Sequence, residues 1–304
     1  MTSFLGPLDW SFPTNPAAAD GSVSGLGRTV IVGAATGAVH TELAIGRLEP
    51  GGWLGRHVHS FEEGLYLLAG ELTFELDGHA WRLRPGDYVL VPIGTWHLLA
   101  NLGVEPVRWV SVNSPLRRPP SDPRRDTFFR PGSPDLSALA GAPAPSFGVP
   151  TVHGVGHYVG TPPQAEAFAL SDPARGRAPA GMDTAILAYS GISVKMLIDR
   201  GLGADHLTMF TVDYEAGGAA QSHDHPFEEA YVILEGEVEA EFDGVTRRLG
   251  PGDVAFAAVG VSHGFYNDGP GRVRWLETQA PQPPGRHSYR WDQAWARFDP
   301  KDAP

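Results

Sequence analysis

Apolar and polar residues alternate over two short stretches of the chain, residues 71–76 and 237–242. A period of two is typical of a β-strand with one buried face. An Asp-Gly pair follows each stretch, and such pairs favour the positive-φ turn of a tight hairpin. Pro-Gly-Asp at 85–87 and 251–253 marks a further turn. We therefore expect short strands joined by tight turns, as in a β-sandwich or jelly roll.

These two stretches belong to an internal repeat. Residues 49–115 match residues 215–281 at a constant offset of 166, with no insertion or deletion. The matching residues in the first copy are Glu49, Gly51, Gly52, His57, His59, Phe61, Glu62, Glu63, Gly70, Glu71, Asp77, Gly78, Pro85, Gly86, Asp87, Gly94, His97, Asn101, Arg108, Trp109 and Pro115. A repeat of this length predicts two β domains in tandem.

The repeat gives a division of the chain. We predict an N-terminal extension (1–27), a first barrel (28–115), a Pro- and Arg-rich linker (116–160), a second barrel (161–286) and a C-terminal helix and tail (287–304). The linker follows from eight prolines between Leu116 and Pro150. The helix is predicted from the helical spacing of Trp291, Trp295 and Phe298.

The linker also holds a cluster of arginines. Asp122 and Asp126 lie among them, which favours a solvated surface over an anion-binding patch. The arginines are Arg117, Arg118, Arg124, Arg125 and Arg130.

Composition excludes several classes of function. A net charge of −12 opposes binding to nucleic acid or to an anionic membrane. Without cysteine, any metal must bind through His, Asp or Glu. Neither a signal peptide nor an apolar run of membrane-spanning length is visible, so we expect a cytoplasmic protein.

Each copy contains His-x-His, a glutamate four residues later and a third histidine 34 residues beyond it. Residues i and i+2 of a strand project to one face, so both imidazoles can enter one cavity. Three imidazoles and a carboxylate suit a divalent first-row metal. The predicted ligands are His57, His59, Glu63 and His97 in the first copy, and His223, His225, Glu229 and His263 in the second.

Alternation along the strands predicts the lining of the two cavities. Beside the first ligand set it consists of Leu65, Leu67 and Leu99, and beside the second of Tyr231, Ile233 and Phe265. Both cavities are therefore mainly apolar. We name Glu63, Glu229 and Tyr231 as catalytic candidates, with Tyr231 either a proton donor or a core tyrosine bonded to a carbonyl.

Glu62 and Glu228 directly precede the two ligand carboxylates and are expected to point away from the metal. We interpret both as solvated glutamates, with support of a ligand histidine as the alternative.

The motifs Gly51-x5-His57-x-His59-x3-Glu63-x6-Gly70 and Gly86-x5-Pro92-x-Gly94-x2-His97-x3-Asn101 resemble the two cupin motifs. The second copy repeats both and departs only at Ala258, where the motif has proline. The resemblance implies a bicupin, with two double-stranded β-helix (jelly-roll) barrels in tandem. It also implies a site of three histidines and one glutamate in each barrel, and thus up to two metal ions per chain.

The resemblance leaves the reaction open, since cupins share a fold and not an activity. Our first hypothesis is a dioxygenase-type oxidoreductase acting on a small organic substrate. Fe or Mn is favoured, with Ni, Cu, Co and Zn as alternatives, and no organic cofactor is predicted. The second is a non-redox hydrolase, isomerase or decarboxylase, similar to the ureidoglycine aminohydrolases or oxalate decarboxylases.

The third hypothesis is a metal-binding cupin without catalysis. The apolar strand faces would also permit a homodimer, and no other macromolecular partner is predicted.

Overall fold

The computed structural model describes residues 3–119, 121–145, 154–157, 186–189, 191–283 and 290–291. Nearly all regular structure in them is β, and the described helices are the short 3-10 turns η1 (Ala34–Thr36), η2 (Leu136–Leu139) and η4 (Arg200–Leu202). None of these is long and apolar enough to cross a membrane.

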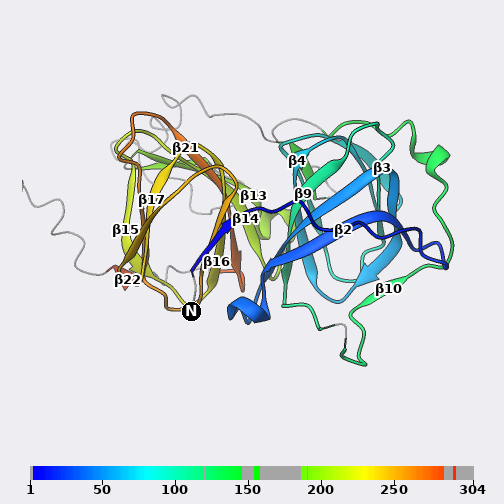
Figure 1. Ribbon diagram of the computed structural model, residues 1–304, viewed down its shortest axis with the longest axis horizontal. Helices are drawn as coiled ribbons and strands as arrows, with labels where there is room; N and C mark the ends of the chain where they lie inside the picture. The colour runs from blue at the N-terminus through cyan, green and yellow to red at the C-terminus, as the bar shows by residue number, and fades with distance from the viewer. Residues whose placement is uncertain are drawn as a thin grey trace, which may run out of the picture. The chain divides into compact units, whose positions relative to one another are not determined.

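The described residues form two compact units, each containing one copy of the sequence repeat (Figure 1). The first barrel comprises residues 9–160 and 197–208, and the second comprises residues 1–8, 161–196 and 209–304, as far as they are described.

The first barrel is one curled sheet whose strands run in the order β11-β7-β4-β9-β3-β8-β5-β6, with β2 and β10 also paired to β3. Pairing of strands far apart in sequence, such as β4 with β9 and β3 with β8, is the crossover pattern of a jelly roll. The strands are β2 (Val23–Val32), β3 (Glu42–His59), β4 (Glu62–Ala69), β5 (Leu72–Leu76), β6 (His79–Leu83), β7 (Asp87–Val91), β8 (His97–Ala100), β9 (Val107–Ser114), β10 (Thr127–Phe129) and β11 (Val155–His157).

The second barrel has two sheets, ordered β1-β19-β16-β21-β14-β13-β12 and β18-β17-β20-β15-β22. The β16–β21 and β15–β20 pairs repeat β4–β9 and β3–β8, so the prediction of tandem jelly-roll barrels is confirmed. The strands are β1 (Phe4–Pro7), β12 (Ile186–Tyr189), β13 (Ile192–Ile198), β14 (Thr208–Tyr214), β15 (Ala219–Asp224), β16 (Glu228–Glu235), β17 (Val238–Phe242), β18 (Val245–Leu249), β19 (Asp253–Ala257), β20 (His263–Tyr266), β21 (Val273–Ala280) and β22 (Arg290–Trp291).

The predicted Asp-Gly hairpins are present in both barrels. Asp77 and Gly78 have φ of 49° and 80° between β5 and β6, and Asp243 and Gly244 have φ of 47° and 76° between β17 and β18. Two successive positive φ angles match the twist of the flanking strands.

Short strands outside the repeat also pair with the sheets of the two barrels, whereas the predicted division placed these residues in an extension and a linker. Within the predicted extension, β1 pairs with β19 of the second barrel. Within the predicted linker, β10 and β11 pair with β3 and β7. Backbone groups at a sheet edge need partners, and these short strands provide them.

The predicted C-terminal helix is wrong at its start. Arg290 and Trp291 form β22, which pairs with β15. Trp295 and Phe298 lie outside the described residues.

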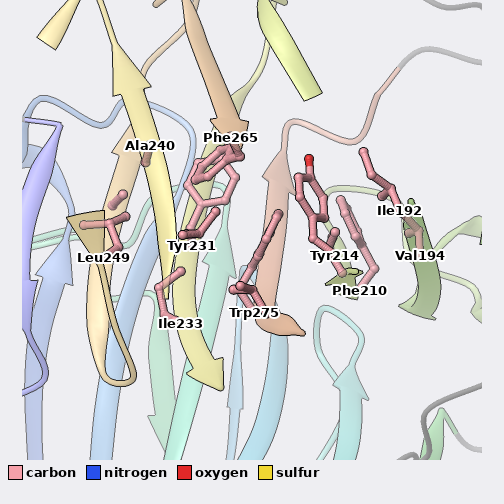
Figure 2. Close-up of a cluster of buried hydrophobic side chains, with 14 of the residues drawn as sticks. Ile192, Val194, Phe210, Tyr214, Tyr231, Ile233, Ala240, Leu249, Phe265 and Trp275 are labelled. Atoms are coloured by element: carbon pink, nitrogen blue, oxygen red, sulfur yellow. The ribbon is translucent and has the colours of Figure 1, made fainter. Parts of the chain in front are cut away.

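Each barrel encloses its own apolar core. The second is rich in aromatic side chains, and Figure 2 shows Tyr214, Tyr231, Phe265 and Trp275 gathered between its strands. Phe265 stacks on Trp275 with ring centroids 5.1 Å apart. The corresponding part of the first core is mostly leucine, including the predicted Leu65, Leu67 and Leu99.

Candidate metal centres

Three histidines meet inside the first barrel. His57 and His59 lie at the end of β3, and His97 begins β8 directly opposite His57. All three are buried, and one ring nitrogen from each lies within 4.8 Å of the others. The sequence folds this way because a bulge in β3 between Leu54 and His57 shifts the register before the His-x-His pair.

Hydrogen bonds fix the tautomer of each of these rings. Nδ1 lies 2.8 Å from the carbonyl oxygen of Gly55 for His57, 2.6 Å from that of Phe61 for His59, and 3.0 Å from that of Thr95 for His97. A carbonyl only accepts, so Nδ1 carries the proton and donates it. The Nε2 lone pairs are thereby available to a metal, as in most histidine sites.

Glu63 completes this group from β4, with Oε2 3.4 Å from Nε2 of His59. Burial of the carboxyl acts to raise its pKa, but the hydrogen bond with His59 and the electrostatic interactions with His59 and His97 hold the pKa of Glu63 at about 2. Burial also lowers the pKa of His57 to about 4 and that of His97 well below its usual range. The site therefore combines a carboxylate with two imidazoles, those of His57 and His97, whose lowered pKa values favour the neutral form that metal binding requires.

The second barrel repeats the arrangement. His223 on β15 lies opposite His263 on β20, and His225 follows two residues later. Their ring nitrogens also lie within 4.8 Å of one another. Nδ1 of each ring is again bound to a carbonyl oxygen, at 2.7 Å from Gln221, 2.9 Å from Phe227 and 2.9 Å from Val261, respectively.

Glu229 is more tightly held than Glu63. Its Oε2 lies 2.7 Å from Nε2 of His225 and 3.0 Å from Nε2 of His263, and it accepts a hydrogen bond from the Tyr231 hydroxyl. Its Oε1 accepts a hydrogen bond of 2.7 Å from Nε2 of Gln279. Every oxygen of this buried carboxylate therefore has a donor.

A second carboxyl group, Glu277, lies beside this cluster and accepts a 2.9 Å hydrogen bond from the Trp275 indole. Burial, followed by the charge of Glu229, raises the pKa of Glu277 well above its usual range. Glu229 is thus the charged member of the pair, and Glu277 is held as the neutral acid.

Both groups of side chains fit a metal ion. In the first barrel, Nε2 of His97 is fully buried and makes no hydrogen bond with any described residue. A buried acceptor without a partner is costly, and coordination would satisfy it. Three imidazole nitrogens and one carboxylate oxygen suit Mn, Fe, Co, Ni, Cu or Zn.

Comparison with known proteins gives the family. The cupin domain family matches residues 44–113 and 210–278, which cover most of the two repeats. The polyketide synthase CurC of Streptomyces cyaneus is 32% identical over 112 residues, which are 36% of this chain and 73% of CurC. The chain is a bicupin of the cupin superfamily.

Solved structures share the fold of this bicupin at low sequence identity. Salicylate 1,2-dioxygenase from Pseudoaminobacter salicylatoxidans, solved as adducts with gentisate, is 17% identical with a TM-score of 0.62, over 87% of this chain and 75% of that one. A glyoxylate-induced protein from Pseudomonas aeruginosa is 16% identical with a TM-score of 0.58, over 96% of this chain and 100% of that one.

The eight predicted ligands come together in the bicupin as two groups of four, although ligation itself stays a prediction. Tyr231, the third catalytic candidate, lies beside Glu229 and donates to its carboxylate, not to a carbonyl. Its role as a proton donor also stays a prediction.

The prediction that Glu62 and Glu228 are solvated was wrong. Glu62 is 2% exposed and Glu228 is 1% exposed. The Glu62 carboxylate accepts hydrogen bonds of 2.8, 2.9 and 3.0 Å from the backbone N–H groups of Asp205, His206 and Leu207. These partners lie more than 140 residues away in sequence, so no local pattern could indicate them.

Sequence reasoning also missed two aromatic supports. The Phe61 ring stacks on His59 at 4.0 Å between centroids, and Phe227 stacks on His225 at 3.9 Å. Phe61 and Phe227 occupy the same position in the two repeats, and this match was the sequence signal for their shared role. In the first barrel Phe129 of β10 also stacks on His57, at 5.0 Å.

Proposed function

We propose that each barrel binds one divalent transition metal, with Fe or Mn favoured, and that the protein is a dioxygenase-type oxidoreductase acting on a small organic substrate. The observation that carries the proposal is the convergence of three Nδ1-protonated, buried histidines in both barrels, with a carboxylate beside them. His57, His59, His97 and Glu63 would hold one ion, and the corresponding residues of the second barrel, His223, His225, His263 and Glu229, would hold the other.

The bound ion would supply Lewis acidity and, where redox-active, electrons for oxygen chemistry. The chain's own residues prepare the surroundings. Leu65 and Leu99 belong to the buried apolar core of the first barrel, and Tyr231 and Phe265 to that of the second. Such apolar walls exclude water from a reacting substrate and strengthen the electrostatic interactions within the cavity.

The fold neighbours support the oxygenase class within this proposal. The salicylate 1,2-dioxygenase structures show that a bicupin of this architecture can act on a small aromatic acid. Their identity to this chain is below 20%, so the choice of substrate depends on experiment.

Oxygen uptake by metal-loaded protein tests the proposal. We expect uptake above the metal-only background with at least one of salicylate, gentisate, catechol or a 1,3-diketone, after loading with Fe or Mn. The variant carrying both His97→Ala and His263→Ala is the matched control and should show none. Absence of uptake with every substrate and every loaded metal would contradict the proposal.

One observation favours a non-redox reaction as the second candidate. In the second barrel the hydroxyl of Tyr231 and the neutral carboxyl of Glu277 lie next to Glu229, and both can move protons. A metal-dependent hydrolase, isomerase or decarboxylase would need such groups and no oxygen. Turnover under strict anaerobiosis with a redox-inert ion such as Zn²⁺ separates this candidate from the first.

A further inference from the structure

A row of polar side chains crosses the wall of the first barrel beside its histidines. Glu42 on β3 pairs directly with Asn113 on β9, and Asn113 pairs directly with Glu63 on β4. Directly opposed residues of neighbouring antiparallel strands project to the same face of a sheet. Asn113 is 0% and Glu42 is 8% exposed, so this row lies within the barrel and ends at the candidate metal site.

Two arginines converge on the far end of this row. Arg28 donates from Nη2 to Oε1 of Glu42 at 2.6 Å, and Nδ2 of Asn113 donates to the same oxygen at 3.3 Å. Nη1 of Arg117 lies 3.9 Å from it. Two guanidinium groups face one glutamate here, and the buried carboxyl group of Asp126 also acts electrostatically on Arg117.

The guanidinium of Arg117 has N–H groups that are available to a ligand. Arg117 forms no hydrogen bond with any described residue, and its side chain is 29% exposed. Its guanidinium lies 5.1 Å from the centre of the Phe61 ring, which also stacks on His59. This cation–π contact holds the guanidinium on the ring that supports His59 and leaves its N–H groups available to a ligand.

Asn113 adds an acceptor. Its Oδ1 is buried and has no hydrogen-bond partner among the described residues. Since Nδ2 must face the Glu42 carboxylate, which only accepts, Oδ1 is turned away from it. A buried amide oxygen without a partner can accept a hydrogen bond from a hydroxyl or amide group of a ligand.

We infer that the first barrel binds a small hydroxycarboxylic acid beside its histidines, with the carboxylate on Arg117 and Arg28 and a hydroxyl on Asn113. A guanidinium matches the planar carboxylate through two parallel hydrogen bonds. The inference deepens the proposed function by naming a substrate class and a barrel, and it rests on that proposal. The partial burial of Arg117 against Phe61 also differs from the solvated surface that the sequence predicted.

The second barrel lacks this arrangement. At the offset of 166, Val194, Thr208 and Pro283 stand where the first barrel has Arg28, Glu42 and Arg117. None of these three side chains carries a charge. The pair of guanidinium groups therefore distinguishes the first site from its duplicate.

Binding measurements on metal-loaded protein test this inference without relying on turnover. Isothermal titration with salicylate and lactate, each against its neutral amide, isolates the contribution of the carboxylate. We expect wild-type protein to bind at least one acid about tenfold or more tightly than its amide, the size of one charge-assisted hydrogen bond. Arg117→Gln should abolish this preference, and Arg28→Lys should reduce it.

The matched control is Arg248→Gln, which removes an exposed arginine of the second barrel and should keep the preference. Metal content and thermal unfolding of each variant show that the site is loaded and folded. The inference is overturned if wild-type protein does not prefer either acid, or if both variants keep the preference. Acid binding without oxygen uptake would overturn only the proposed function, and uptake without a preference only this inference.

Discussion

Glu63 and Glu229 occupy the same position in the two barrels but have different surroundings. The Glu229 side chain is 3% exposed, accepts hydrogen bonds from Tyr231 and Gln279, and lies within 3.0 Å of Nε2 of two histidines. The Glu63 side chain is 17% exposed and contacts only His59 among its group, at 3.4 Å. The Glu229 carboxylate is enclosed and fixed by hydrogen bonds, whereas the Glu63 carboxylate lies at the end of a row of charged and polar side chains.

The difference shows what duplication has kept and what it has changed. The histidines and the stacked phenylalanines are the same in both barrels, and the carbonyl acceptors of the histidines lie at equivalent positions. The cavity walls have diverged, to Arg28, Glu42 and Asn113 in one and to Tyr231 and Glu277 in the other. The same histidine group is thus combined with different neighbouring side chains, and one fold can host different functions in this way.

Metal removal should have the largest effect on stability, and in both barrels. A ligand that binds only the folded state stabilises it by about 3 kcal/mol when its free concentration is 100 times its Kd. Chelation should therefore lower the unfolding temperature, as measured by calorimetry. His97→Ala and His263→Ala should each remove part of this shift. A shift that survives in the double variant would show that the metal binds elsewhere.

Substitution of the shared asparagine should lower the free energy of unfolding equally in the two barrels. Asn101 donates to the carbonyl oxygens of Leu48 and Glu105, and Asn267 makes the same bonds in the second barrel. Asn101→Ala and Asn267→Ala each leave buried carbonyls without donors, at a cost of about 2–3 kcal/mol. Denaturant unfolding of the two variants measures this. A large difference between them would break the equivalence of the two barrels.

The residue before the first ligand histidine should distinguish the barrels. Arg56 binds Glu75 through Nε and Nη2 at 2.6–2.8 Å, whereas the equivalent Ser222 contacts Ser262 at 2.7 Å. Arg56→Ala leaves the buried Glu75 unpaired, and since Arg56 is partly exposed we expect a loss of about 2 kcal/mol. Ser222→Ala should cost about 1 kcal/mol or less. Equal losses in urea unfolding would refute the contrast.

Tyr231→Phe should also have a small effect on stability, about 1 kcal/mol, because Gln279 still donates to Glu229. Its effect on metal binding should be clearer. Loss of a group that orients a ligand carboxylate lowers affinity by about tenfold or more. Competition with a chelator should show weaker binding at the second site and unchanged binding at the first. Weakening of both sites equally would contradict this role.

The sequence was sufficient to predict features that depend on neighbouring residues or on the internal repeat. The constant offset predicted two barrels, the Asp-Gly pairs predicted the hairpins, and the His-x-His spacing predicted which side chains would meet. It was not sufficient where the partner lies far away in the chain. The burial of Glu62 depends on the backbone at residues 205–207, and Glu75 is 5% exposed because Arg56 covers it. Polar residues of this kind look solvated until tertiary contacts are known.

Metal content per chain tests the central claim most directly. Protein produced in medium with balanced Mn, Fe, Co, Ni, Cu and Zn would be measured by mass spectrometry, together with the His97→Ala and His263→Ala variants. Two buried histidine groups predict about two equivalents in the wild type and about one in each variant. Wild-type protein without bound metal, or variants that keep both equivalents, would contradict the account.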